Sequence, residues 1–421
     1  MSVLLGCIAD DFTGASDLAL MLAERGMATT QVLNMAGEVD LGHSNAVVIA
    51  LKTRTSSVEN AVRESLASSD WLLDKGASQL FFKYCSTFDS TSQGNIGPVA
   101  DVLLERVEQD ITVVCPAFPE TGRTIRNGNL YVNGQLLAES PMRNHPLTPM
   151  RESSLLKMMD AQTRPGSSGL ISLETVRSGS PAVKESIEKL KSDGIRYAVT
   201  DIETNSDLEV VGQACKGMRL VTGAAGIALG LVPNFDGFAG VAESACEPLP
   251  KLPGFPLVLS GSCSVATRKQ VEVMRAEHFS IEVNPFDIAS GDQSAEHIGR
   301  QVADAWQEGP VLVFACSDPQ EVLKAQGELG REQSALMIEK TLAEVAQKLA
   351  GLGCHKFIVA GGETSGAVAQ SLGVNALKTG PRIAPGVPWM IRADGQNQVM
   401  AFKSGNFGAG TFFLDAMDML P

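Results

Sequence analysis

Short apolar runs alternate with longer amphipathic stretches along most of the chain. In the first half these runs are rich in Val, Ile, Leu and Phe, and the segments between them, such as residues 58–75 and 182–191, repeat apolar residues at helical spacing. This alternation is typical of βαβ units and of a mostly parallel sheet. The strands predicted from it span residues 3–9, 46–51, 80–83, 111–115, 170–173, 197–200 and 220–222.

Two segments interrupt the alternation. Residues 129–137 carry Asn133-Gly134 between apolar flanks, which predicts a β-hairpin with a type I′ turn. Residues 233–256 are rich in Gly, Pro and Ala and lack a hydrophobic period, as expected of a connector between domains. We therefore predict two domains, residues 1–240 and 257–421, joined by a linker at residues 241–256.

The pattern of strands and helices resumes after the connector. Helices are expected from Val265 and from Ala335, and Ser334 is expected to cap the second one. The core-facing residues predicted for that helix are Ile338, Leu342, Val345 and Leu349. The strands predicted here span residues 257–260, 311–315 and 357–360. The fold class is therefore α/β, with two α/β domains and mostly parallel sheets.

Composition narrows the classes of protein that fit this pattern. A chain of 421 residues exceeds one ordinary domain of ~150 residues, and 44% hydrophobic with 19% charged residues is typical of a folded globular protein. The 34 Lys and Arg against 48 Asp and Glu give a net charge of −14, which opposes binding to nucleic acid or to an acidic membrane surface. An anionic small substrate would therefore need a local cluster of basic side chains.

Cysteine and histidine spacing excludes further classes. The eight cysteines are scattered without C-x-x-C, which predicts a reducing, cytoplasmic compartment and no disulfide framework. The five histidines show no metal-ligand spacing, so any metal is expected on oxygen ligands that remain unassigned. No apolar stretch approaches the ~20 residues that span a membrane.

The first candidate for chemistry is the segment IADDFTGA at residues 8–15, between the opening strand and a helix expected near Ala15. Ligands bind at the carboxyl ends of strands in an open parallel sheet, and both Asp10 and Asp11 fall there. Neighbouring side chains point in different directions, so the pair predicts one carboxylate for a hydroxyl and one for a cation or the backbone. Alternatively, Asp11 or Thr13 caps the helix.

A second candidate is FKYCSTFDST at residues 82–91, followed by a glycine-containing turn at residues 94–97. Hydroxyls at a strand end offer donors to an anionic ligand, although a simple Ser/Thr-rich turn explains each of them singly. Lys83 differs from them, because a cation beside a Phe-rich strand needs a partner or a ligand.

Arginines form a third candidate group. Residues 116–151 concentrate them within an acidic chain, and Arg123 and Arg151 suit bidentate recognition of carboxylate or phosphate. A solvated loop without such a role is the alternative. Arg54 follows the second predicted strand and is expected at the same edge of the sheet as Asp10.

Three glycine-containing turns lie in the second half. LVLSGSCS at residues 257–264 and FIVAGGETSG at residues 357–366 run from a strand through small residues into a helix, and KSGNFG occupies residues 403–408. Backbone N–H groups and helix N-termini at such turns cradle phosphates. None matches the P-loop or the G-x-G-x-x-G fingerprint, so each is a weak signal alone.

Taken together, these motifs resemble the four-carbon acid sugar kinase family. IADDFTGA resembles its N-terminal signature, and AGGETSG at residues 360–366, APGVP at 384–388 and KSGNFG resemble its nucleotide-binding motifs. KYCSTFDST with GNIG resembles the variant of the 3-oxo-tetronate kinases. Threonate and erythronate kinases typically carry Lys-x-Asp-Ser-Thr-x-Arg-Gly-Asn there, whereas this chain has Cys85 in place of that Asp.

The resemblance implies an N-terminal acid-sugar domain, a C-terminal ATP-binding domain and transfer of the γ-phosphoryl group to the C4 hydroxyl of 3-oxo-tetronate. Asp10 or Asp11 is expected to be the general base, with Lys83 beside the transferred phosphate and Mg²⁺ on the phosphates. The residues expected to bind the acid sugar are Arg54, Ser86, Asp89, Arg123 and Arg151. Those expected to bind ATP are Ser260, Gly361, Gly362, Glu363, Thr364, Gly405 and Asn406. We expect the two groups to face each other across a cleft, and a homodimer is compatible with the resemblance.

Three other functions compete with this one. A kinase for threonate or erythronate differs only in the group accepted at C3. An NAD-dependent oxidoreductase would share the two α/β domains, but the chain lacks the dinucleotide fingerprint. A non-catalytic sensor would bind ATP and a sugar acid without turnover.

Overall fold

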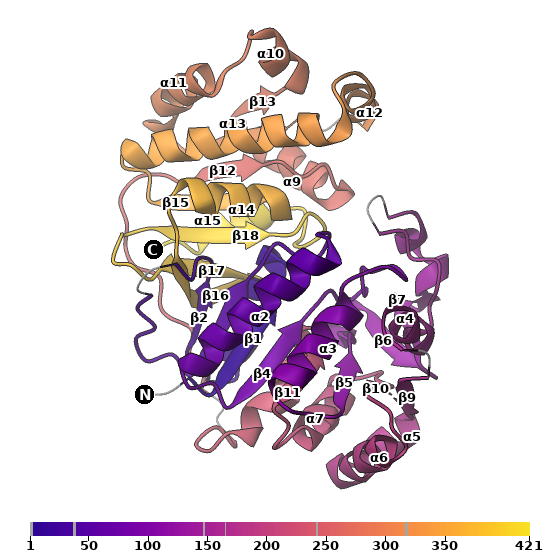
Figure 1. Ribbon diagram of the computed structural model, residues 1–421. Helices are drawn as coiled ribbons and strands as arrows, with labels where there is room; N and C mark the ends of the chain where they lie inside the picture. Colours follow the sequence, from indigo (N-terminus) through magenta and orange to yellow (C-terminus); the bar gives the residue numbers. More distant parts are fainter. Residues whose placement is uncertain (1–2, 37–38, 146–147, 165, 241–242, 316–318) are drawn as a thin grey trace. The chain divides into compact units, whose positions relative to one another are not determined.

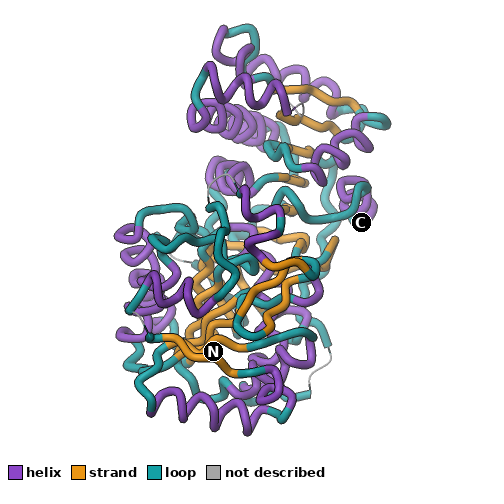
Figure 2. Tube along the Cα trace, turned by 90° about the vertical axis from the view of Figure 1, so that its right-hand side faces the viewer, coloured by secondary structure: helices purple, strands orange, loops and turns teal. Residues whose placement is uncertain are grey.

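The computed structural model describes residues 3–36, 39–145, 148–164, 166–240, 243–315 and 319–421, and it divides into two compact units, residues 1–246 and 247–421. In each unit helices lie on both sides of the strands (Figure 1, Figure 2). The predicted class, two α/β domains with mostly parallel sheets, is confirmed.

The main sheet of the N-terminal unit is parallel throughout its described pairs, in the order β2-β3-β1-β4-β11-β5-β10-β9. Strands β1, β4, β5 and β11 are fully buried, which explains why they appear in the sequence as continuous apolar runs. The strands are β1 (Leu5–Ala9), β2 (Thr29–Val32), β3 (Ala46–Ala50), β4 (Gln79–Lys83), β5 (Thr112–Cys115), β9 (Ser168–Ile171), β10 (Tyr197–Thr200) and β11 (Leu220–Gly223).

The connections of this sheet diverge at β1. Helix α1 carries the chain to β2 on one side and packs on β2 and β3, whereas α2 carries it from β3 to β4 on the other side and packs on β1. In open α/β sheets, ligands bind at the carboxyl end of strands beside such a divergence, and Asp10 follows β1 at that end. The helices of the unit are α1 (Phe12–Glu24), α2 (Val58–Asp74), α3 (Ile96–Arg106), α4 (Leu155–Gln162), α5 (Leu173–Arg177), α6 (Ser180–Ser192), α7 (Asn205–Ala214) and α8 (Ala228–Leu231).

The predicted hairpin is confirmed and belongs to a small separate sheet. Strand β7 (Asn129–Val132) pairs with β8 (Gln135–Leu136) across Asn133 and Gly134, whose φ angles of 51° and 80° are those of a type I′ turn. Strand β6 (Arg123–Arg126), which the sequence pattern missed, pairs with the other edge of β7.

The sheet of the C-terminal unit has the order β13-β14-β12-β15-β18-β17-β16. Pairs from β13 to β18 are parallel, whereas β16–β17 and β17–β18 are antiparallel. The strands are β12 (Leu257–Ser260), β13 (Phe279–Val283), β14 (Val311–Ala315), β15 (Lys356–Ala360), β16 (Ala376–Ala384), β17 (Val387–Arg392) and β18 (Val399–Lys403). The helices are α9 (Val265–Arg275), α10 (Pro285–Ser290), α11 (Ala295–Trp306), α12 (Pro319–Glu328), α13 (Arg331–Gly351), α14 (Gly362–Ser371) and α15 (Phe412–Asp418).

Ser334 is not an N-cap, and that prediction is wrong. Helix α13 begins at Arg331 after Gly330, and the buried Ser334 hydroxyl donates to the Arg331 carbonyl from within the first turn. Apolar periodicity marks only the core-facing part of a helix, and the polar residues before it extend α13 towards its N-terminus. The predicted apolar face is confirmed, because Ile338, Leu342, Val345 and Leu349 are all buried.

Candidate functional site

Asp10 lies at the meeting point of three strand ends. It follows Ala9, which stands abreast of Ala50 in β3 and of Lys83 in β4. The Asp10 amide donates to the Lys83 carbonyl at 3.0 Å, so the residues after β1 and the end of β4 are held together. Asp10 and Lys83 are each only 4% exposed, which makes this a buried pair of opposite charges at the carboxyl edge of the sheet.

Arg54 is fixed against Asp10 through both side chain and backbone. Its Nε and Nη2 donate to the two carboxylate oxygens of Asp10 at 2.9 and 2.8 Å. The amides of Thr53 and Arg54 also donate to the Asp10 carbonyl, while Asn95 Nδ2 donates to the Thr53 carbonyl at 2.8 Å. A bidentate guanidinium–carboxylate pair has defined geometry, so Asp10 mainly orients Arg54.

Asp11 caps helix α1, which confirms that interpretation, and it also lies in the charged cluster. Its Oδ1 accepts from the Gly14 amide at 3.1 Å as the N-cap of α1, and its Oδ2 accepts from Thr13 Oγ1 at 2.9 Å. The same Oδ1 lies 2.5 Å from Arg54 Nη2 and 3.6 Å from Lys83 Nζ. The Asp11 side chain is 22% exposed against 6% for Asp10, so Asp11 is the more accessible carboxylate.

Two carboxylates and two cations balance one another in this cluster of Asp10, Asp11, Arg54 and Lys83. Burial raises the pKa of Asp10, with Arg54 opposing it. Burial alone would also raise the pKa of Asp11. The charges of Arg54 and Lys83 and the hydrogen bonds from Thr13 and Gly14 together outweigh burial, so the pKa of Asp11 is lowered. Asp11 is therefore ionised at neutral pH and can accept a proton only from a group held directly against it.

The loop after β4 contains two further predicted residues, Ser86 and Asp89. Thr87 Oγ1 donates to Asp89 Oδ1 at 2.6 Å and lies 3.0 Å from Cys85 Sγ. Burial raises the pKa of Cys85 to about 11, Asp89 adds to this rise, and Arg54 and Lys83 oppose it. Asp89 and Cys85 are thus bridged by the Thr87 hydroxyl, and the partly buried Ser86 lies between Cys85 and Asp89 in the chain.

The two arginines predicted from the cationic stretch stand apart from this cluster. Arg123 begins β6 and donates through Nη1 to the Thr121 carbonyl, and Arg151 is exposed in the segment before α4. Within the described ranges neither forms a hydrogen bond or ion pair with Asp10, Asp11, Arg54 or Lys83. Their role in binding the acid sugar therefore stays a prediction.

In the C-terminal unit, the predicted nucleotide-binding turns converge. Ser260, Ala360 and Lys403 stand abreast at the carboxyl ends of β12, β15 and β18. A Cβ on Gly261 would lie 2.1 Å from Thr364 Oγ1, and one on Gly405 would lie 2.5 Å from Ser262 Oγ. The turns are in such close contact that a side chain at Gly261 or Gly405 would displace the hydroxyl of Thr364 or Ser262.

These turns leave donors available for an anion. Helix α14 starts after Gly361, which has φ 118° and provides no side-chain cap, so among the described residues the N–H groups of Gly362 and Thr364 lack the partner that a cap would supply. The hydroxyl of Ser260 is buried without a hydrogen-bond partner among the described residues. Unpaired N–H groups at the start of a helix attract phosphate.

Lys403 and Thr267 were missed as individual site residues. Lys403 is fully buried, and burial lowers its pKa to about 7. Its Nζ donates to Thr267 Oγ1 at 2.8 Å and to the carbonyls of Ser404 and Gly405. The KSGNFG motif pointed to the region of Lys403, but no sequence signal distinguishes Thr267 from an ordinary helix residue.

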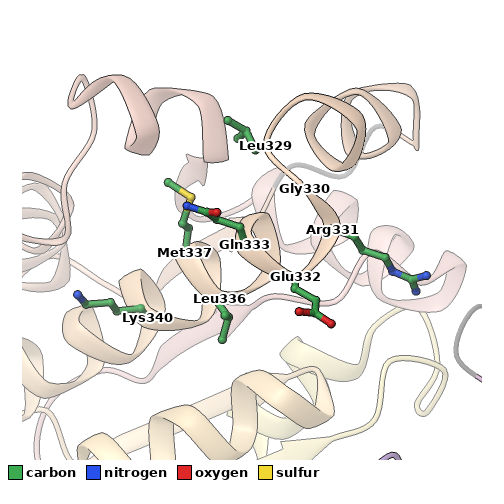
Figure 3. A pocket seen from close by; sticks show the side chains of 8 residues that line it. All are labelled: Leu329, Gly330, Arg331, Glu332, Gln333, Leu336, Met337 and Lys340. Carbon is green, nitrogen blue, oxygen red and sulfur yellow. The ribbon is translucent and has the colours of Figure 1, made fainter.

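Outside these two sites, the described residues hold no metal-ligand group, and two hollows found there are not lined by predicted residues. No group of three or more His, Cys, Asp and Glu side chains is arranged to hold a metal ion there. A hollow beside the start of α13 contains none of the predicted residues (Figure 3). It is lined by Leu329, Gly330, Arg331, Glu332, Gln333, Leu336, Met337 and Lys340. No described helix is long and apolar enough to cross a bilayer.

Comparison with known proteins places both units in one family. A family model described as a sugar-binding N-terminal domain matches residues 5–231, and one described as a nucleotide-binding C-terminal domain matches residues 257–413. The 3-oxo-tetronate kinase of Burkholderia multivorans is 47% identical over 418 residues, covering 99% of this chain and 97% of that protein. The same enzyme from Pseudomonas savastanoi pv. phaseolicola is 46% identical over 420 residues, with the same coverage.

A solved structure has the same fold. A crystal structure from Salmonella typhimurium LT2, of a protein provisionally described as a tRNA synthase, matches with a TM-score of 0.89 at 39% identity and covers 99% of each chain. The net charge of −14 opposes extending that description to this chain. The chain belongs to the four-carbon acid sugar kinase family, in which the two relatives compared above are 3-oxo-tetronate kinases.

Proposed function

We propose that the chain is an ATP-dependent kinase that phosphorylates the C4 hydroxyl of 3-oxo-tetronate, giving 3-oxo-tetronate 4-phosphate and ADP. The observation that carries the proposal is identity of 46–47% over 99% of the chain to proteins of that name. The charged cluster after β1 and the converging turns after β12, β15 and β18 supply the two kinds of site that such a reaction needs.

Asp11 is the general base of the proposed mechanism. Phosphoryl transfer has a loose transition state, so the base needs correct placement more than high basicity, and an ionised Asp11 beside Lys83 meets that need. Asp10 orients Arg54 without touching substrate. Arg54 and Lys83 stabilise the negative charge of the acid sugar and of the transferring phosphoryl group.

The turns of the C-terminal unit hold ATP in this proposal. The N–H groups of Gly362 and Thr364 at the start of α14 receive phosphate oxygens, and the Ser260 hydroxyl and the Gly405–Asn406 peptide complete the cradle. Mg²⁺ binds through phosphates, waters and one or two carboxylates, so the Glu363 carboxylate fits as its protein ligand. When bound, the ion neutralises phosphate charge during transfer.

The remaining assignments belong to the same proposal. The acid-sugar domain spans residues 1–240, the linker residues 241–256 and the ATP-binding domain residues 257–421. Ser86 and Asp89 contact the sugar acid near the cluster, whereas Arg123 and Arg151 contribute only if the segments that carry them reach the substrate. Use of ATP implies a cytoplasmic location. The chain is also proposed to form a homodimer, and analytical ultracentrifugation tests this by measuring the mass in solution.

Measurement of ADP release over a panel of four-carbon acids tests this function. 3-Oxo-tetronate is expected to support turnover with kcat/KM well above that of D-threonate and D-erythronate. Preference for either hydroxy acid would assign the chain to the sister activity. Binding of ATP and a sugar acid without ADP release would identify a sensor and overturn the proposal.

A further inference from the structure

Three donors converge on a single backbone carbonyl in the C-terminal unit. The Gly405 oxygen accepts from Ser264 Oγ at 2.5 Å, from Thr267 Oγ1 at 2.7 Å and from Lys403 Nζ at 3.1 Å. Ser264 is the N-cap of α9, and Thr267 lies in the first turn of the same helix. The carbonyl is therefore held against the start of α9 from three directions.

Lys403 is fully occupied by protein oxygens. Its ammonium carries three protons, and it has three acceptors at 2.8, 3.0 and 3.1 Å, namely Thr267 Oγ1 and the carbonyls of Ser404 and Gly405. Both Lys403 and Thr267 are 0% exposed. A lysine beside phosphate-binding turns would ordinarily be taken as a phosphate ligand, but this one has neither a free proton nor access to solvent.

The direction of the Gly405 carbonyl fixes the next amide. A trans peptide is planar, so the N–H of Asn406 points opposite to the Gly405 oxygen and away from α9. Asn406 is exposed, and its amide has no hydrogen-bond partner among the described residues. On its other side, Gly405 packs so closely on Ser262 that a Cβ would lie 2.5 Å from the Ser262 hydroxyl. Gly405 therefore lies between the start of α9 and the Ser262 hydroxyl.

We infer that Lys403, Thr267 and Ser264 are positioning residues that aim the Asn406 amide at the nucleotide phosphates, and that Lys403 itself makes no phosphate contact. This inference rests on the proposed binding of ATP by the C-terminal unit. Loss of any one donor frees the Gly405–Asn406 peptide to turn and withdraws one N–H group from the phosphate cradle. The acid-sugar site involves none of these residues.

Thr267→Val and Thr267→Ser test the inference, because valine keeps the volume and removes the hydroxyl, whereas serine keeps the hydroxyl. Thr267→Val is expected to weaken ADP binding, measured by calorimetry, and to raise the KM for ATP by about tenfold, the equivalent of one lost hydrogen bond of ~1.4 kcal/mol. Thr267→Ser is expected to keep wild-type values. The KM for the sugar acid stays unchanged in both variants.

Lys403→Met is paired with Lys356→Met as a control. Lys356 is also a buried lysine of this unit whose pKa burial lowers, but it lies at the opposite end of β15 and donates to the Gly254 carbonyl at 2.9 Å. Lys403→Met is expected to raise the KM for ATP as Thr267→Val does. The double variant is expected to have a KM for ATP only slightly above that of either single variant, because both residues act on one peptide. Lys356→Met is expected to change stability alone.

Three outcomes decide the matter. An unchanged affinity for ADP in Thr267→Val overturns the inference. This test does not depend on Lys403→Met, so it remains decisive even if Lys403→Met fails to fold. The inference is also overturned if the double variant loses as much ATP affinity as the sum of the two single variants, because Thr267 and Lys403 would then act separately. If the wild-type chain binds neither ATP nor ADP, the proposed function fails first, and this result is distinct from a loss confined to the variants.

Discussion

The ammonium of Lys83 lies 3.6 Å from Oδ1 of Asp11, and the two groups can approach this closely because residue 14 is a glycine. A Cβ on Gly14 would lie 1.8 Å from Lys83 Nζ and 2.2 Å from Asp11 Oδ1. Gly14 lies within α1, so its absent side chain, and not an unusual backbone angle, lets the charged groups meet.

Gly14→Ala is expected to reduce kcat/KM by about 100-fold, because displacement of reacting groups by ~1 Å has effects of that size. The stability should change less, since alanine favours the helix by ~1 kcal/mol over glycine and partly offsets the clash. Steady-state kinetics and urea unfolding measure the two effects. Gly351→Ala, in α13 where a Cβ would meet nothing within 4 Å, is the control. Wild-type kcat/KM in Gly14→Ala would show that the cluster tolerates displacement.

Asp11→Asn is expected mainly to reduce catalysis, whereas Asp10→Asn is expected mainly to reduce stability. Asparagine caps helices as well as aspartate does, so Asp11→Asn should lose less stability than Asp10→Asn, although it removes the charge that pairs with Arg54 and Lys83. Its kcat should fall by about 10²–10⁴-fold, the usual contribution of a general base. Asp10→Asn breaks the buried pair with Arg54 and should lower the free energy of unfolding by on the order of 3 kcal/mol. Turnover of Asp11→Asn near the wild-type rate would exclude Asp11 as the base.

The sequence predicted the elements whose patterns are local. Buried parallel strands such as β4 and β12 appear as apolar runs, and Asn133-Gly134 marks its turn directly. Strand β13 was missed because the prediction relied on continuous apolar runs, whereas the residues of β13 alternate between apolar and polar. The antiparallel pair of β16 and β17 breaks the βα alternation on which the prediction also relied.

The sequence predicted those site residues that lie at or just after the ends of recognisable strands. Asp10, Arg54 and Lys83 all follow or end strands, so their meeting at one sheet edge was expected. The bidentate pairing of Arg54 with Asp10 joins residues far apart in the chain and depends on side-chain geometry that no local pattern carries. The same is true of Thr267, whose role depends on the Gly405 carbonyl.

Stability should depend on pH through Lys403. Burial lowers the pKa of Lys403 to about 7, whereas the unfolded chain keeps that proton to about 10.5. Between these values the unfolded state binds more protons, so this group makes the free energy of unfolding rise with pH, by at most ~1.4 kcal/mol per unit. Below pH 7 the contribution is flat. Chemical unfolding at several pH values measures the slope, and Lys403→Met should remove it; an equal slope in the variant would contradict this assignment.

Identification of the product by ³¹P NMR is the most direct test of the central claim. After incubation with ATP and 3-oxo-tetronate, a phosphate ester signal split into a triplet by the two C4 protons is expected, in an amount equal to the ADP formed. A doublet would place the phosphate on the C2 hydroxyl, and inorganic phosphate alone would indicate ATP hydrolysis. Either result would contradict the proposed 4-kinase activity.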